Sequence, residues 1–135
     1  MKICVSAVAG SLDARVDPRF GRCAYYVIVD SGTMQFEAVL NTASGAMGGA
    51  GIQAAQNIVN RKVDVLITGN VGPNAFQVLS AAGIKVVPNA FGTVTEVVER
   101  YKKGELEETK GPTVRGHFGA GAGRGRGWRG DRWED

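Results

Sequence analysis

The chain contains few of the residues on which enzymes and metal sites usually depend. Its 135 residues include two cysteines and one histidine, too few for a four-thiolate cluster or a disulfide framework. The histidine, His117, lies in a glycine- and arginine-rich end, so the rest of the chain has no Ser/His/Asp set. Asp30 and Asp64 stand at the ends of apolar runs and form no acidic cluster for catalytic metals. No enzyme constellation of these kinds is therefore evident in the sequence.

A long apolar segment is also missing. Met1 and Lys2 lead directly into a short alternating run, so we expect no export signal, no membrane span and a reducing, cytoplasmic location. Residues 1–110 carry 11 basic and 10 acidic side chains, whereas residues 111–135 carry five arginines and three acids. The net charge of +3 therefore belongs largely to the C-terminal end, and the remainder shows no basic face typical of nucleic-acid binding.

Apolar periodicity predicts the secondary structure. Alternation and β-branched residues predict strands, whereas apolar residues three and four positions apart predict helices. Cys4 lies in the first apolar run and is expected to be buried. Thr93 and Glu96 form a capping-box pattern, and Gly83 and Gly104 are placed to end helices. The predicted strands are 2–8, 25–30, 34–40, 63–68 and 84–87, and the predicted helices are 52–60, 74–82 and 93–103.

The order β-β-β-α-β-α-β-α predicts an α/β fold. The second and third strands, joined at Ser31 and Gly32, form a β-hairpin, and the later β-α units require parallel strands with right-handed crossovers. We therefore predict a mixed five-stranded sheet with one antiparallel hairpin and helices on both faces. Residues 1–108 are predicted to form this domain. Residues 109–135, where Gly and Arg alternate without apolar periodicity, are predicted to be a disordered Gly/Arg-rich tail.

Three short motifs lie around the predicted turns. Residues 18–23 read Pro-Arg-Phe-Gly-Arg-Cys, residues 48–55 read Gly-Gly-Ala-Gly-Ile-Gln-Ala-Ala, and residues 69–76 read Gly-Asn-Val-Gly-Pro-Asn-Ala-Phe. In this order and spacing they resemble the dinitrogenase iron–molybdenum cofactor biosynthesis family. That family includes NifX-like carriers and the carboxyl-terminal domain of NifB-like proteins, and it is related to the orange protein. The resemblance covers about the first 105 residues.

The resemblance implies a ribonuclease-H-like, three-layer α/β/α sandwich, in agreement with the predicted order of elements. It also implies a non-enzymatic role, the binding, carriage or assembly of an anionic metal–sulfur cluster. The implied cofactor is a molybdenum- or iron-containing sulfide cluster, with or without copper, and the implied protein partners are cofactor-assembly proteins. Several family members carry a histidine where this chain has Arg19, which favours charge pairing over direct ligation at that position.

An anionic cluster can be held by backbone N–H groups and cations where thiolates are scarce. N–H groups at helix N-termini bind anions, and ligands of open α/β sheets bind beyond the carboxyl ends of the strands. Both glycine-rich motifs follow strands and precede helices, and neither contains the Gly-Lys-Ser/Thr of a phosphate loop. The predicted cofactor-binding residues are Arg19, Phe20, Gly21, Arg22, Cys23, Gly48, Gly49, Gly51, Asn70, Gly72 and Asn74, with Cys23 as the candidate soft metal ligand.

These residues also have purely structural interpretations. The glycine runs are consistent with ordinary loop connections. Arg19 and Arg22 are consistent with solvated side chains or with ion pairs to Asp13 and Asp17. Cys23 is consistent with an inert, half-buried residue.

The C-terminal end suggests a competing function. Gly-Arg repeats with Trp128 and Trp133 resemble segments that bind single-stranded nucleic acid, so a nucleic-acid-binding protein acting through this tail is the alternative hypothesis. The same guanidinium groups also suit anionic metal sulfides, and a solubilising end is a third interpretation. His117 is the one candidate metal ligand there.

Overall fold

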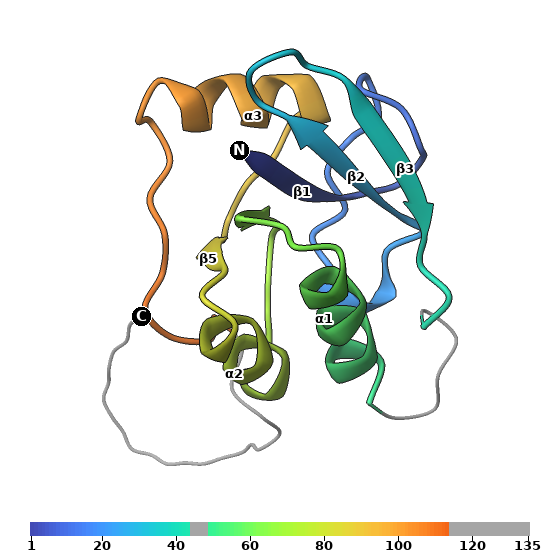
Figure 1. Ribbon diagram of the computed structural model, residues 1–135, viewed down its shortest axis with the longest axis vertical. Coiled ribbons are helices and arrows are strands. Elements are labelled where there is room, and N and C mark those ends of the chain that lie inside the picture. Colours follow the sequence, from blue (N-terminus) through green and yellow to red (C-terminus); the bar gives the residue numbers. More distant parts are fainter. Residues whose placement is uncertain (44–48, 114–135) are drawn as a thin grey trace.

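The computed structural model describes residues 1–43 and 49–113 of the chain. These residues form a sheet flanked by α-helices, with one short 3-10 helix (Figure 1). The strands are β1 (Lys2–Ala7), β2 (Tyr25–Asp30), β3 (Phe36–Leu40), β4 (Val65–Ile67) and β5 (Lys85–Val87). The helices are α1 (Ala50–Asn60), α2 (Pro73–Ala81), α3 (Val94–Lys102) and the 3-10 helix η1 (Phe20–Arg22).

The predicted mixed five-stranded sheet is confirmed. Its strand order is β3-β2-β1-β4-β5. The β1–β2 and β2–β3 pairs are antiparallel, whereas β1–β4 and β4–β5 are parallel. The two parallel connections contain α1 and α2, as right-handed β-α-β crossovers require.

Helices cover both faces of the sheet, so the fold is the predicted α/β/α sandwich (Figure 1). The alternation of side chains along β1 divides the core into two parts. Cys4 faces the α1 and α2 side with Leu66 and Ile58. Ile3 and Val5 face the α3 side, where Val97 and Val98 cover them. Burial of both faces explains why β1 and β4 are almost wholly apolar.

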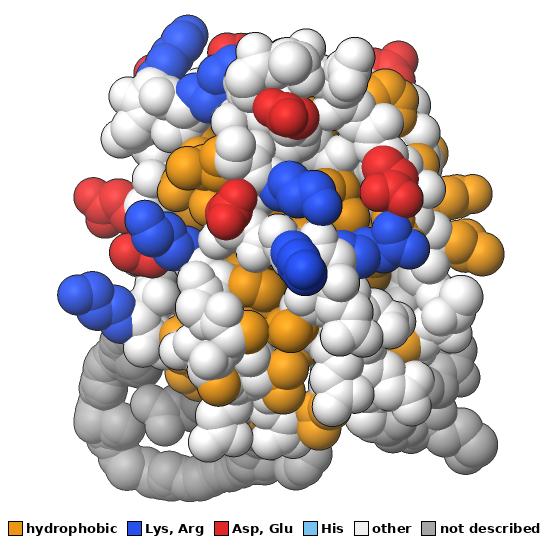
Figure 2. Space-filling model, viewed as in Figure 1, with side chains coloured by type: hydrophobic (Ala, Val, Ile, Leu, Met, Phe, Trp, Pro, Cys, Tyr) orange, Lys and Arg blue, Asp and Glu red, His pale blue; other side chains and the backbone are white. Residues whose placement is uncertain are grey.

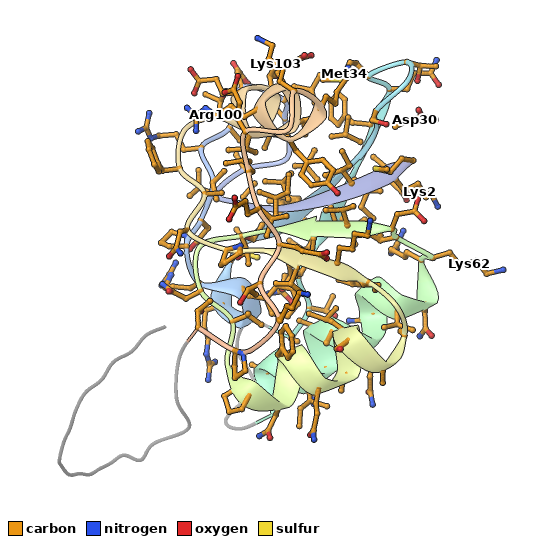
Figure 3. The ribbon with its side chains drawn as sticks, turned by 90° about the vertical axis from the view of Figure 1, so that its left-hand side faces the viewer. Lys2, Asp30, Met34, Lys62, Arg100 and Lys103 are labelled. Carbon is orange, nitrogen blue, oxygen red and sulfur yellow. The ribbon has the colours of Figure 1, made fainter. Side chains whose placement is uncertain are left out.

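The hairpin connection is longer than predicted. The third strand begins at Phe36 instead of residue 34, because residues 31–35 form the turn. The Asp30 carboxylate accepts a hydrogen bond from the Gly32 N–H at 2.8 Å, and Met34 adopts a φ of 62°. This backbone turns the Met34 side chain toward α3, where it packs on the core (Figure 3).

The predicted signals at helix ends are confirmed at α3. The Thr93 hydroxyl accepts a hydrogen bond from the Glu96 N–H, and the Glu96 carboxylate accepts one from the Thr93 N–H. Gly104 follows the helix with a φ of 76°, and Gly83 follows α2 with a φ of 80°. Glycine adopts this left-handed conformation without a Cβ clash.

The chain remains on the domain after α3. The Thr109 N–H donates to the Val86 carbonyl at 2.7 Å, so residues 105–113 run along the outer edge of β5. Thr113 then exchanges hydrogen bonds with the backbone of Val71. The predicted domain boundary after residue 108 thus falls within a segment that contacts the domain. Of the predicted disordered tail, 109–135, residues 109–113 are part of this segment, and residues 114–135 lie outside the described residues.

Candidate functional site

The carboxyl ends of β1, β3, β4 and β5 meet at one edge of the sheet, because these strands run in the same direction. The segments that follow them bring the motif at 18–23, the described part of the motif at 48–55 and the motif at 69–76 to this edge. In open α/β sheets this is the edge where ligands bind. Figure 3 shows Lys2 and Lys62 at the opposite edge, far from η1.

The first and third motifs are in direct backbone contact. The Asn70 N–H donates to the Pro18 carbonyl at 2.7 Å, and Arg19 forms a parallel bridge with Asn70. Gly69 lies so close to Pro18 that a Cβ at position 69 would be 2.4 Å from the Pro18 Cα. Only glycine allows this approach, which explains one glycine of the third motif.

The second motif packs between the other two. A Cβ at Gly21 would lie 3.0 Å from the Gly51 backbone, and a Cβ at Gly51 would lie 3.4 Å from the Ala75 Cβ. η1 therefore rests on the first turn of α1, and the first turns of α1 and α2 lie side by side. The three sequence motifs thus form one continuous surface.

The N-termini of α1 and α2 carry no side-chain cap. Gly49 precedes α1 with a φ of 72°, and Gly72 precedes α2, with Pro73 at the first helical position. Neither first turn contains an acidic residue, whereas α3 has both a capping box and Glu96. Because Pro73 has no N–H, the uncapped donors of α2 begin at Asn74. Together with the first N–H groups of α1 and the positive ends of both dipoles, they make this edge a candidate anion site.

Arg19 is held in an ion pair, one of the interpretations that the sequence left open. Its Nη2 lies 2.9 Å from Asp17 Oδ2 and its Nε 3.1 Å from Oδ1. The Arg19 side chain is 67% exposed, whereas that of Asp17 is 4% exposed. The hydrogen bonds from Arg19 lower the pKa of the Asp17 carboxyl. Asp17 therefore offsets the charge that Arg19 brings to this edge.

Phe20 and Cys23 support the motif from beneath. Both side chains are buried, and the Phe20 ring packs against Tyr26. The Phe20 carbonyl accepts hydrogen bonds from the Tyr26 hydroxyl and the Cys23 thiol. Burial raises the pKa of the Cys23 thiol to about 11. In this conformation Cys23 is a protonated core residue that does not reach a ligand at the surface.

The remaining predicted residues lie at the surface or outside the described chain. Arg22 is exposed at the end of η1, and Asn74 is exposed in the first turn of α2. Asn70 lines a cavity of about 420 Å³ between the ends of β4 and β5 and residues 109–113. Gly48 lies outside the described residues, as does every residue on which the nucleic-acid alternative depends.

Asn41 is a positioning residue that the sequence did not identify. Its side-chain amide donates to the carbonyls of Gly21 and Cys23, at 3.1 and 2.9 Å, and its Oδ1 accepts from the Ala43 N–H. Asn41 thereby joins the end of β3 to η1. Its only signal in the sequence was its place between a strand and a glycine-rich segment.

Within residues 1–43 and 49–113, no group of three or more His, Cys, Asp and Glu side chains is arranged to hold a metal ion. Among the same residues, no helix has the length and apolar character needed to cross a bilayer. Figure 2 shows basic and acidic side chains interspersed over the face in view. The site is therefore defined by backbone geometry more than by a cluster of charged ligands.

A sequence model described as dinitrogenase iron-molybdenum cofactor matches residues 1–104. The chain belongs to this family. Its fold is also that of solved relatives. The apo form of the orange protein from Desulfovibrio gigas is 45% identical, with a TM-score of 0.82 over 84% of this chain and 96% of that one. A candidate NifB protein from Thermotoga, solved by NMR, is 38% identical, with a TM-score of 0.69 over 79% of this chain and 91% of that one.

A protein of Methanocaldococcus jannaschii is 31% identical over 112 residues, which is 80% of this chain and 95% of the relative. The match to the dinitrogenase iron-molybdenum cofactor family includes every residue predicted for the site. It ends at residue 104, so the segment 105–113 along β5 lies beyond the matched region.

Proposed function

We propose that the protein binds and carries an anionic metal–sulfur cluster at the carboxyl edge of its sheet, without an enzymatic step of its own. The cluster is a molybdenum- or iron-containing sulfide, with or without copper. The observation that carries this proposal is the side-by-side arrangement of two uncapped helix N-termini, α1 and α2, against the turn at η1. Family membership supports it.

Backbone N–H groups are the main donors in this proposal. Sulfide ligands of a cluster are large and polarizable, and several N–H groups converging on one concave surface stabilise negative charge without a bond to the metal. The first turns of α1 and α2 supply such groups, since no side chain at Gly49 or Gly72 caps them. Arg22, at the end of η1, adds a cation beside them.

Arg19, Cys23 and Phe20 act indirectly. Arg19 remains paired with Asp17 and shapes the turn, while Phe20 and Cys23 anchor η1 to the core. Cofactor-assembly proteins are the proposed partners, and the cytoplasm is the proposed location, since both cysteines are free thiols and a reducing compartment keeps them so.

The test is titration of the apo-protein with tetrathiomolybdate, alone and with copper or iron salts. We expect a change in visible absorbance and shifts of the amide resonances of Gly21, Arg22, Gly49 and Gly72. The amide of Glu96, at the capped start of α3, serves as an internal control and should not move. Unchanged resonances at all four site amides would refute the proposal.

Substitutions at Gly72 distinguish the effects of side-chain volume, hydrogen bonding and charge on cluster binding. A Cβ at this position meets no atom within 4 Å, and the extended backbone at Gly72 suits any residue. Gly72→Ala leaves the N–H groups uncovered and should bind as the parent does. Gly72→Asn covers N–H groups, and Gly72→Asp adds a negative charge as well. We expect affinity to fall in that order, with a loss of roughly tenfold for Gly72→Asp.

The same variants test whether misfolding could account for weaker cluster binding. Asn and Asp are preferred helix caps, so both variants should be at least as stable as the parent, with a gain of up to about 0.3 kcal/mol. Weaker binding by a more stable variant cannot come from unfolding. Equal affinity for Gly72→Ala and Gly72→Asp would exclude the N-terminus of α2 from the site.

A further inference from the structure

The two edge strands of the sheet, β5 and β3, differ in how their outer edges are covered. The edge of β5 is covered, because the Thr109 N–H pairs with the Val86 carbonyl and residues 105–113 run alongside. The edge of β3 has no such cover among the described residues: β3 pairs with β2 and is the terminal strand of the sheet. Open strand edges promote association unless lysine, proline or a bulge protects them.

β3 has little of that protection. Its sequence, Phe-Glu-Ala-Val-Leu, contains no lysine or proline. Its one charged residue, Glu37, is paired with Arg61 at 2.9 Å. Phe36 and Leu40 are 44% and 59% exposed, and Figure 2 shows hydrophobic side chains projecting on the side where Figure 1 has β3. The edge is thus apolar at both ends.

The hydrogen-bond pattern of β2 and β3 shows which backbone groups face outward. The Asp30 N–H donates to the Gln35 carbonyl, and the Asn41 N–H donates to the Ala24 carbonyl. In an antiparallel pair such bonds recur at every second residue. Residues 37 and 39 therefore bond to β2, whereas the N–H and C=O groups of Phe36, Ala38 and Leu40 point away from the sheet.

We propose that this edge pairs with the same edge of a second copy of the chain, antiparallel and about a two-fold axis at Ala38. Outward-facing groups then meet outward-facing groups, since Ala38 opposes Ala38 of the second copy and Phe36 opposes its Leu40. Aromatic and aliphatic side chains directly opposite each other are a favourable cross-strand pair. A two-fold axis requires such a self-complementary surface, and the strand sequence provides it.

The proposal fixes the geometry of the dimer. Two antiparallel copies of β3 make one continuous sheet, and the carboxyl edges of the two copies point in opposite directions. Each candidate site is then complete within its own copy, so association and cluster binding are independent. Two five-residue strands bury a small area, so we expect a weak, reversible dimer.

Sedimentation equilibrium of the full chain over a wide range of concentrations tests the association. We expect a monomer that converts to a dimer as concentration rises, with slower amide exchange at Phe36, Ala38 and Leu40 in the dimer. A monomeric mass up to the solubility limit would overturn the proposal. Dimerisation without protection of these amides would overturn it as well.

Charge variants test the register. Phe36→Lys alone and Leu40→Glu alone each place a charge opposite an apolar residue, so each variant should be monomeric. In an equimolar mixture, the introduced lysine at position 36 lies opposite the introduced glutamate at position 40, and the other pair stays apolar. The mixture should therefore dimerise again. Dimers of either single variant, or no dimer in the mixture, would contradict the proposed register.

A matched control comes from Phe91, which is also exposed but lies between β5 and α3. Phe91→Lys makes the same chemical change away from β3 and should dimerise like the parent. If Phe91→Lys is monomeric while Phe36→Lys still dimerises, the interface lies elsewhere and the proposal fails.

Discussion

Asp17 and Arg19 form a two-point ion pair in which the acid is buried and the base is exposed, with contacts of 2.9 and 3.1 Å. The Arg19 N–H also donates to Asp17 Oδ1 at 2.9 Å. The carboxylate therefore fixes both the backbone and the side chain of Arg19. This arrangement makes Asp17 the structural centre of the first motif, although it lies just outside it in the sequence.

Replacing Asp17 by asparagine should reduce stability at neutral pH and change its dependence on acid. The pKa of Asp17 is lowered in the folded state, so its stabilisation is present above its ordinary pKa and is lost as pH falls through the folded value. We expect Asp17→Asn to lose about 1–3 kcal/mol of stability at pH 7. Its free energy of unfolding should also fall less steeply than that of the parent as the pH is lowered. Urea unfolding between pH 7 and pH 2 measures both effects.

The control for this experiment is Asp13→Asn, which changes an exposed acid on the same loop. It should keep the stability of the parent at pH 7. If Asp17→Asn and Asp13→Asn behaved alike, the ion pair with Arg19 would have no special part in stability.

Cys23 should be chemically inert in the folded protein. Its thiol is buried and its pKa is raised to about 11, so very little reactive thiolate exists at pH 8. We expect alkylation by iodoacetamide only at the rate of unfolding, and tetrathiomolybdate binding by Cys23→Ala equal to that of the parent. Rapid labelling of the native protein, or lost binding in the variant, would restore Cys23 as a ligand.

Gly69 and Gly72 should respond in opposite ways to the same substitution. Gly69→Ala places a Cβ 2.4 Å from the Pro18 Cα, so the two loops must separate, at a cost of about 1–3 kcal/mol. Gly72→Ala meets no neighbouring atom and should be neutral or slightly stabilising. Thermal unfolding of the pair measures the difference. Equal losses would mean that the close approach to Pro18 is not required.

The segment along β5 should contribute to stability in part through the backbone N–H of Thr109. Thr109→Pro removes the N–H that donates to the Val86 carbonyl at 2.7 Å and should cost about 1 kcal/mol. Thr109→Ala keeps that N–H and loses the hydrogen bonds of the hydroxyl with the Gly111 carbonyl and the Gly111 N–H. Thr109→Pro loses these bonds as well, so Thr109→Ala should cost less. Chemical denaturation compares the two variants. A larger loss for Thr109→Ala would contradict the assigned role of the backbone bond.

The fold was predictable from the sequence because local signals agreed with tertiary structure. The alternation around Ile3 and Val5, the capping box at Thr93 and Glu96, and the glycine at 104 all specify elements that the structure contains. The mixture of antiparallel and parallel strands followed from the hairpin and the right-handed crossovers, whereas the strand order comes from the structure. The boundaries of short strands such as β4 differed, because strand ends depend on pairing partners rather than on residue type.

The arrangement of the site was less predictable because it depends on contacts between distant residues. The turn at η1 forms where the Tyr26 hydroxyl and the Asn41 amide bind carbonyls of the first motif. No periodicity marks such contacts. The sequence allowed Arg19 to be either a solvated cation or the partner of an acid. In the structure it pairs with the buried Asp17 carboxylate.

The contact between Gly69 and Pro18 also makes the candidate site a mechanically coupled unit. Because the Asn70 N–H is bonded to the Pro18 carbonyl and no side chain separates the two loops, a displacement of one loop must be transmitted to the other. Asn70 stands only two residues before Gly72, so movement of the first motif would reorient the start of α2. We therefore expect a ligand that touches η1 alone to shift the amide resonances at the N-terminus of α2 as well.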